Sequence, residues 1–174
     1  MKPATVELNL ASPQVMAIVN VTPDSFYAGS RNRTTEAIER RVLEAVGEGA
    51  LILDVGGYSS RPGAAEVPVE EEWARVKAGV GAVRRLAPAA VVSVDTFRSE
   101  VARRVLEEFG PVIINDISAG ELDPPMLDVV ARQGIPYVAM HMKGDPQTMQ
   151  SLTEYRRDIT TEVVSYFRAR VERL

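Results

Sequence analysis

The sequence contains no cysteine and only one histidine, and each scarcity removes a class of chemistry. Without cysteine the chain can form no disulfide, no thiolate metal site and no thiol nucleophile. The single histidine, His141, lies between Met140 and Met142, and one histidine cannot build a zinc site without partner ligands. We therefore predict that His141 packs beside a site and does not bind a metal.

Long apolar runs and an excess of basic residues are also missing. No stretch approaches the ~20 apolar residues of a membrane span, and the first ten residues lack the long apolar core of a secretory signal. The net charge is -4 and the pI about 5.2, with basic residues scattered along the chain. This pattern argues against nucleic-acid or membrane binding. We expect a cytoplasmic protein that holds any anionic ligand at a local site.

The composition is that of a globular protein, with 45% hydrophobic and 25% charged residues in 174. We expect residues 1–174 to form a single domain. Within it, short apolar runs alternate strictly with segments of helical period. The predicted strands cover residues 15–19, 50–55, 90–94, 112–114 and 136–140. The predicted helices cover residues 35–48, capped by Thr34 or Thr35, then 70–87, 98–108, 123 to the stop at Gly134, and 153–174.

Five strand–helix units with nearly continuous apolar strands predict an α/β fold, in which helices cover a parallel sheet. An open doubly wound sheet and a (β/α)8 TIM barrel both fit this pattern. The dinucleotide-binding form of the open sheet is weakened because no G-x-G-x-x-G motif follows the first strand. A barrel places its chemistry just past the strand ends, where this chain carries Asn20, Asp54, Asp95, Asn115 and His141. Since a whole barrel typically needs about 250 residues, we expect an incomplete one with the first five βα units.

The strand-end residues suggest different roles. Aspartate and asparagine are common in turns for structural reasons, and for Asp54 we favour a structural role that holds the loop after Gly57. Asp95 and Asn115 follow uninterrupted apolar strands. Together they offer an acceptor-only carboxylate and a donor–acceptor amide, which suit the edge of a flat heterocycle.

Two long loops could complete such a site. The strand at 15–19, which we predict to be buried on both faces, stops at Asn20 and gives way to a polar loop that is typical of a lid or a site rim. In the second loop, Arg61 could bind a phosphate or carboxylate, or could be a solvated loop arginine. We interpret the run Glu70, Glu71 and Glu72 as a solvated first helical turn.

Five motifs make the pattern specific. They are VNVTPDSF at 19–26, DVGGYSSRPGA at 54–64, SVDT at 93–96, IIND at 113–116 and MHM at 140–142. In order and spacing they resemble the dihydropteroate synthase family, pterin-binding barrel enzymes of folate synthesis. The resemblance covers the chain from about residue 15 onward and favours the barrel over the open sheet.

The resemblance implies a transferase that condenses 6-hydroxymethyl-7,8-dihydropterin diphosphate with p-aminobenzoate and releases pyrophosphate, with Mg²⁺ as cofactor. Asn20 would bind the ion or the diphosphate. A loop lid would fold over the leaving group, formed by Thr22, Pro23, Asp24, Ser25 and Phe26.

The substrate site is implied in the same way. The pterin would be held by Asp95 and Asn115, and the diphosphate and p-aminobenzoate by Ser60, Arg61 and Pro62. Met140 would also contact substrate. Asp95 and Arg61 would be the catalytic residues. The complete protein would be a homodimer.

The chain also departs from the family. Ala28, Tyr58 and Ser60 stand where the family usually has Asp, Glu and Thr. The family's later Asp-Pro-Gly, Ser-Arg-Lys and Arg-x-His segments have no counterpart, so we expect the isolated chain to be inactive. Two alternatives stay open: a non-catalytic half-barrel that self-associates through exposed sheet edges, and a related methyltetrahydrofolate:corrinoid methyltransferase domain.

Overall fold

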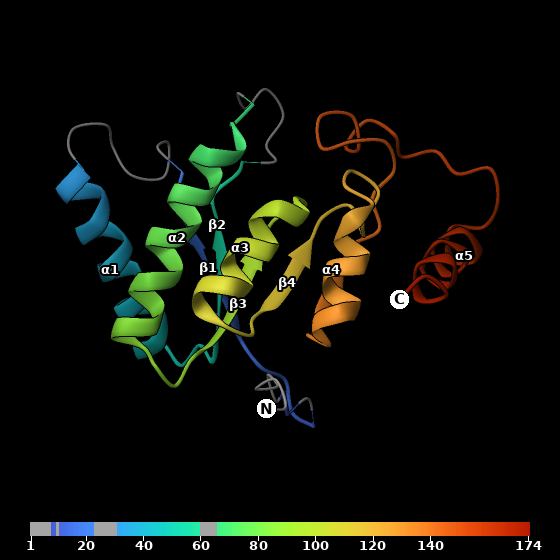
Figure 1. Cartoon of the computed structure of the whole chain (residues 1–174). Coiled ribbons are helices and arrows are strands. Elements are labelled where there is room, and N and C mark those ends of the chain that lie inside the picture. Colours follow the sequence, from blue (N-terminus) through green and yellow to red (C-terminus); the bar gives the residue numbers. More distant parts are fainter. Residues whose placement is uncertain (1–7, 10, 23–30, 60–65) are drawn as a thin grey trace.

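The computed structural model describes the chain except for residues 1–7, 10, 23–30 and 60–65 (Figure 1). Strands and helices alternate along it, as the sequence predicts. The strands are β1 (Met16–Asn20), β2 (Ile52–Gly56), β3 (Val91–Asp95), β4 (Ile113–Asp116) and β5 (Tyr137–Ala139). The helices are α1 (Arg31–Gly47), α2 (Val69–Leu86), α3 (Ser99–Phe109), α4 (Pro125–Gln133) and α5 (Ile159–Val171).

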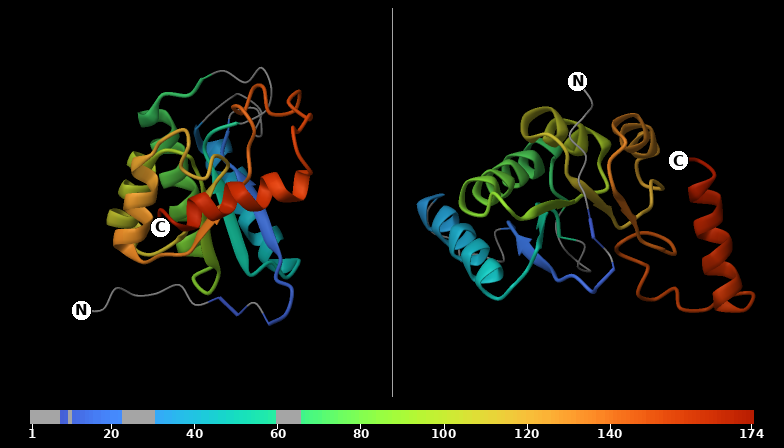
Figure 2. Two further views of the ribbon diagram at one scale, coloured as in Figure 1. Left: turned by 90° about the vertical axis from the view of Figure 1, so that its right-hand side faces the viewer. Right: turned by 90° about the horizontal axis from the view of Figure 1, so that it is seen from below.

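The order of the strands decides between the two predicted folds. Every strand pairs in parallel with the next, in the order β1-β2-β3-β4-β5. A doubly wound sheet reverses its order at a switch point, and this sheet does not. Right-handed connections that always step in the same direction leave their helices on one face, and α1 to α4 form an arc outside the sheet (Figure 2). The chain therefore has the first five units of a barrel wall.

The core lies between the sheet and helices α1 to α4. Because side chains alternate along a strand, one side chain in two points to the helices. These outer positions are fully buried at Val19, Leu53, Val55, Val94 and Ile114. They meet the apolar faces of the helices, which contribute Val42, Val76, Val80, Val83, Val101 and Val105.

The inner face of the sheet is covered less well at its two edges. Ile18 of β1 is 59% exposed and Val138 of β5 is 42% exposed. The prediction that the first strand is buried on both faces is therefore wrong, because only its outer side chains have helices to cover them. No helix in the described part of the chain is both long and apolar enough to cross a membrane.

Two helix predictions need correction. Helix α1 begins at Arg31, so Thr34 and Thr35 lie inside it and are not its cap. Helix α5 runs from Ile159 to Val171 instead of over 153–174. It begins where the Asp158 carboxylate accepts a hydrogen bond from the Thr161 N–H at 3.0 Å, the usual way to satisfy a free helix N-terminus.

Helix α5 also differs from the others in its packing. It lies at the β5 side of the molecule, apart from the arc of α1 to α4 (Figures 1 and 2). It buries no residue, and Val171 on its predicted apolar side is 71% exposed. Its predicted apolar side is therefore covered only in part by the described residues, since Phe167 contacts the ring of His141 whereas Val171 stays exposed.

Two glycines of α2 allow its packing on β2 to be tested. A Cβ on Gly79 would lie 2.5 Å from Val55 Cγ1, whereas a Cβ on Gly81 would meet nothing within 4 Å. We predict that Gly79→Ala lowers the free energy of unfolding by about 1–3 kcal/mol through overpacking. Gly81→Ala should raise it by about 0.5–1 kcal/mol, because alanine favours the helix. Urea denaturation of the two variants measures both effects, and similar values would contradict this packing.

Candidate active site

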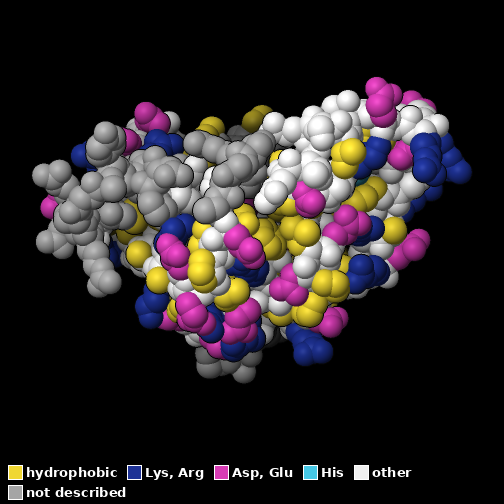
Figure 3. All heavy atoms as spheres, turned by 90° about the horizontal axis from the view of Figure 1, so that it is seen from above, with side chains coloured by type: hydrophobic (Ala, Val, Ile, Leu, Met, Phe, Trp, Pro, Cys, Tyr) yellow, Lys and Arg dark blue, Asp and Glu magenta, His cyan; other side chains and the backbone are white. Residues whose placement is uncertain are grey.

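Four strands end in one row across the inner face of the sheet. The register pairs Asn20 with Gly56, Gly56 with Asp95, and Asp95 with Asn115. These residues are the last or the last but one of their strands, so the row lies at the carboxyl ends, which point toward the top of Figure 1. Three of the five predicted strand-end residues, Asn20, Asp95 and Asn115, are therefore neighbours in space although 95 positions separate the first from the last. Seen from above, acidic and basic side chains are interspersed on this side of the molecule (Figure 3).

Glycine at position 56 leaves a recess in the middle of the row. A Cβ there would lie 3.3 Å from the Asp95 Oδ2 atom and 3.5 Å from the Asn20 Oδ1 atom. The two oxygens thus converge over backbone that carries no side chain. A small ligand or ion in the recess can contact both.

Asp54 lies one pair deeper in the sheet and is hydrogen-bonded across it. Its Oδ1 accepts from Ser93 Oγ at 2.6 Å, and its Oδ2 accepts from Asn115 Nδ2 at 3.0 Å. Burial raises the pKa of Asp54, and the two hydrogen bonds oppose that rise. The predicted role of Asp54 in holding the following loop stays a prediction, because residues 60–65 of that loop lie outside the described residues. Within the described residues, Arg75 holds the start of the loop by donating to the Gly57 carbonyl at 3.0 Å.

Asp95 is the acid of the row, and its pKa is strongly raised. Burial raises its pKa to about 7, and the nearby Asp54, Glu72 and Asp116 carboxylates add to the rise by repulsion. Near neutral pH the carboxyl group therefore exists in both protonation states. It can donate or accept a hydrogen bond or a proton at the edge of a ligand.

The interpretation of Glu72 as part of a solvated turn is wrong. Glu72 is fully buried, accepts a hydrogen bond from Thr96 Oγ1 at 2.6 Å and pairs with Arg98 at 2.7 Å. The sequence did carry a signal for this, because Glu72 precedes Val76 by four residues and so shares the buried face of the helix. Burial raises the pKa of Glu72, while Thr96 and Arg98 oppose the rise.

Arg98 connects the segments that follow β2 and β3. Its guanidinium carbon lies 5.1 Å from the ring centre of Tyr58 and 5.4 Å from that of Phe97. The two rings contact each other edge to face at 5.1 Å. Tyr58 therefore acts as an aromatic partner of a buried ion pair.

A further buried carboxylate, Asp116, faces the helices next to the row. It accepts hydrogen bonds from the Ser118 N–H at 2.7 Å, the Gly120 N–H at 2.9 Å and the Tyr137 hydroxyl at 2.7 Å. These contacts shape the turn after β4 and join it to β5. Sequence reasoning missed Asp116, although its place directly after Asn115 puts it on the opposite face of the strand.

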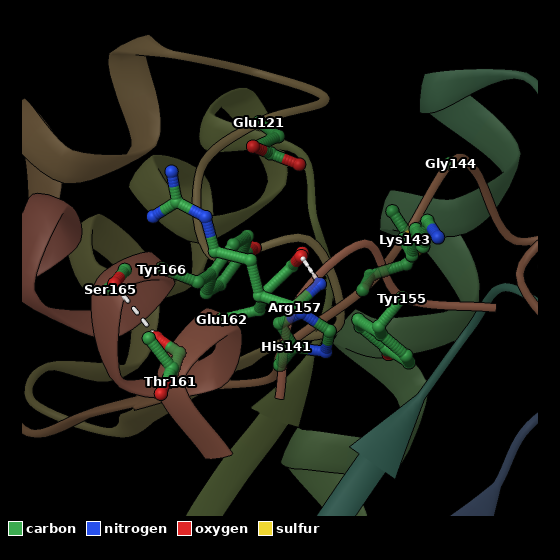
Figure 4. Close-up of a pocket in the computed structure, with 11 residues that line it drawn as sticks. Glu121, His141, Lys143, Gly144, Tyr155, Arg157, Thr161, Glu162, Ser165 and Tyr166 are labelled. Carbon is green, nitrogen blue, oxygen red and sulfur yellow. Dashed lines mark hydrogen bonds between the residues drawn. The ribbon is translucent and has the colours of Figure 1, made fainter. Parts of the chain in front are cut away.

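His141 does not join the row, which corrects the prediction that five strand ends converge. Val138 pairs with Asn115 in β5, and the strand ends at Ala139. His141 packs on α5 with its ring centre 4.7 Å from that of Tyr166, in keeping with the predicted packing role. These residues line a cleft of about 610 Å³ between the segment after β5 and helix α5 (Figure 4). Met140, predicted to touch substrate, is 37% exposed.

Several predicted site residues lie outside the described residues. These are the lid residues Pro23, Asp24, Ser25 and Phe26, the second-loop residues Ser60, Arg61 and Pro62, and the departure Ala28. Thr22, at the start of the lid, is described and buried. In the described part of the chain, no group of three His, Asp or Glu side chains could hold a metal ion. A cation here would take few protein ligands, as Mg²⁺ does when substrate phosphates complete its shell.

The strand order and the row of polar residues define an α/β-barrel type of protein, with polar side chains gathered at the carboxyl ends of its strands, where barrel enzymes place their chemistry. The family model described as pterin binding enzyme matches residues 16–174. The chain therefore belongs to the pterin-binding enzyme family.

Three known proteins illustrate the match. The chain is 44% identical over 167 residues to the dihydropteroate synthase of Escherichia coli (strain K12), covering 95% of this chain and 57% of that protein. It is 43% identical over 160 residues to the mitochondrial folate synthesis bifunctional protein of Arabidopsis thaliana, with coverage of 90% and 29%. The structure of Xanthomonas albilineans dihydropteroate synthase with 4-aminobenzoic acid aligns with a TM-score of 0.79 at 42% identity, covering 94% and 56%. The chain spans about half the length of these synthases.

The burial of Glu72 predicts an unequal effect of two neighbouring substitutions. Glu72→Ala leaves Arg98 without its buried partner and should lower the free energy of unfolding by about 3–5 kcal/mol. Glu70→Ala removes an exposed pair with Arg104 and should change it far less. Thermal and urea unfolding of the full-length protein measure both variants. Equal losses would mean that Glu72 is solvated after all.

The raised pKa of Asp95 predicts a pH dependence of stability. Its folded pKa of about 7 lies above the usual 3.8, so the unfolded chain ionises first as pH rises. The native state therefore loses stability between about pH 4 and 7. Asp95→Asn stays neutral, and its stability relative to the parent should increase by a few kcal/mol between about pH 4 and pH 8. Urea denaturation across this range measures the difference, which would be constant if Asp95 titrated normally.

Proposed function

We propose that the protein to which this chain belongs is a dihydropteroate synthase. The observation that carries the proposal is the row of Asn20, Gly56, Asp95 and Asn115 at the carboxyl ends of four strands, in a chain of the pterin-binding family. The relative from Escherichia coli bears this name, and the relative from Xanthomonas albilineans was solved with 4-aminobenzoic acid. Since the chain spans about half of these relatives, the activity proposed is that of the complete barrel, and the isolated chain would be inactive.

In this proposal Asp95 and Asn115 hold the pterin, with Met140 beside it. The amine of p-aminobenzoate attacks the pterin methylene, where a C–N bond forms as the C–O bond to the diphosphate breaks. Pyrophosphate leaves with the electron pair, and the amine loses its proton. The Asp95 carboxylate would stabilise the positive charge that grows on the ring, so no protein nucleophile is needed.

Mg²⁺ fits the donors of the recess. The Asn20 Oδ1 atom is an oxygen ligand of the kind that Mg²⁺ prefers, and it lies 3.5 Å from the position that a Cβ on Gly56 would take. Asn20 would hold the ion or the diphosphate, and the bound ion would neutralise charge on the leaving group. By their sequence motifs, residues 22–26 would close over the diphosphate, and Ser60, Arg61 and Pro62 would order it beside p-aminobenzoate, with Arg61 catalytic.

The proposal includes a cytoplasmic location and a homodimer for the complete protein. A self-associating half-barrel is the second candidate, and one observation favours it. Strands β1 and β5 form the two edges of the described sheet, and they expose Ile18 and Val138 on its inner face. Such edges can pair with another chain.

The test is a coupled assay of pyrophosphate release by the full-length protein. We expect release that requires the pterin diphosphate, p-aminobenzoate and Mg²⁺ together. Asp95→Asn should lower kcat by about 10²–10³-fold. Asn20→Ala should raise the Mg²⁺ concentration needed for half-maximal activity by about tenfold or more, because an oxygen ligand is lost. The packing-neutral variant Gly81→Ala is the control.

Three results would contradict the proposal. Absence of any release that depends on p-aminobenzoate, in a monodisperse full-length protein, would reject the synthase. Methyl transfer from methyltetrahydrofolate to a corrinoid would assign the chain to the other pterin-binding activity. Concentration-dependent association without either activity would favour the half-barrel.

A further inference from the structure

The orientation of the Asn115 side-chain amide has a physical cause in the deeper layer of the sheet. An asparagine amide can turn either its oxygen or its nitrogen toward a neighbour. Here the neighbour is the Asp54 Oδ2 atom, which lies 3.0 Å from Asn115 Nδ2. An ionised carboxylate only accepts hydrogen bonds, so it selects the orientation in which the nitrogen faces it. The Asn115 carbonyl oxygen must then point away from Asp54.

Asp54 is itself held in place. Its other oxygen accepts from Ser93 Oγ at 2.6 Å, and the residue is 6% exposed. Ser93 lies on the adjacent strand β3 and Asn115 on the next one, β4, and the register of both strands is set by the backbone. The carboxylate therefore acts from a rigid element, as an effective positioning group must.

We propose that Asp54 is a positioning residue that decides how Asn115 reads the bound heterocycle. By taking one N–H of the amide, it presents the Asn115 carbonyl as an acceptor in the same row as the Asp95 carboxylate. Two neighbouring acceptors select a ligand edge that carries N–H donors, such as the aminopyrimidine edge of a pterin. The inference rests on the proposed function for the identity of the ligand, but not for the Asp54–Asn115 contact.

An isosteric substitution separates this role from simple packing. Asp54→Asn keeps the size of the side chain but lets it donate as well as accept, so Asn115 no longer has one preferred orientation. In the reversed orientation the Asn115 amide would place its N–H groups opposite the N–H donors of the ligand. We expect affinity for 6-hydroxymethylpterin, measured by calorimetry on the full-length protein, to fall about tenfold or more.

A double-mutant cycle identifies the route of the effect. In an Asn115→Ala background the amide is absent, and Asp54→Asn should then change the pterin affinity less than about twofold. The control is Tyr137→Phe, which removes a hydrogen bond to the buried Asp116 on the opposite face of the sheet. It should lower stability but leave affinity unchanged. Equal losses from Asp54→Asn in both backgrounds, or no loss in either, would overturn the proposal.

A measurement on the unmutated protein covers the case in which Asp54→Asn does not fold. The side-chain amide signals of Asn115, identified by their loss in Asn115→Ala, can be followed by ¹⁵N NMR without ligand. One of the two protons should lie downfield and exchange slowly because it is bound to a carboxylate. Two equivalent, rapidly exchanging protons would reject the inference. If that signal is present and the parent binds no pterin, the proposed function fails and the Asp54–Asn115 pair stands.

Discussion

The strict alternation of side chains along five parallel strands is the constraint on which the rest of this structure depends. Each strand sends every second residue outward into the helices and the others inward. Since the strands follow one another in order and in register, all outward residues form one core and all inward residues form one face. The apolar outer set holds the strands in place. The polar residues that point inward therefore lie in one row, although they are far apart in the sequence.

The same arrangement places acids where water is scarce, and neighbouring groups decide what each acid does. Asp116 and Glu72 are each satisfied by several donors, so they act as structural anchors of the turns beside the row. Asp54 shares its two oxygens between Ser93 and Asn115. Among the described residues, the influences on Asp95 all raise its pKa, namely burial and three neighbouring carboxylates. A group left in this state costs stability, which is characteristic of a residue kept for chemistry.

At the two edges of the sheet, apolar side chains are not covered by the described part of the molecule. Ile18 and Val138 lie at the two edges with apolar side chains in contact with solvent, and α5 carries an apolar stripe without burying it. In the family to which the chain belongs, the matched proteins are about twice as long. Exposed apolar groups at these places are consistent with a wall that further strands and helices would cover.

Sequence alone determined the order of the strands and helices and the residues at the strand ends, because hydrophobic periodicity and chain order are local properties. Periodicity left an open sheet and a barrel both possible, the sequence motifs favoured the barrel, and the order of the strands in the sheet decided between them. The sequence also indicated Asn20, Asp95 and Asn115 as partners, since carboxyl ends of parallel strands share one edge. Only the tertiary structure decided the partners of Asp54, the burial of Glu72 and the place of His141. These depend on which strand lies beside which and on which helix face meets the sheet. A side chain's neighbours across a sheet, unlike its neighbours along the chain, follow from register and packing, and these also raise the pKa of Asp95 to about 7.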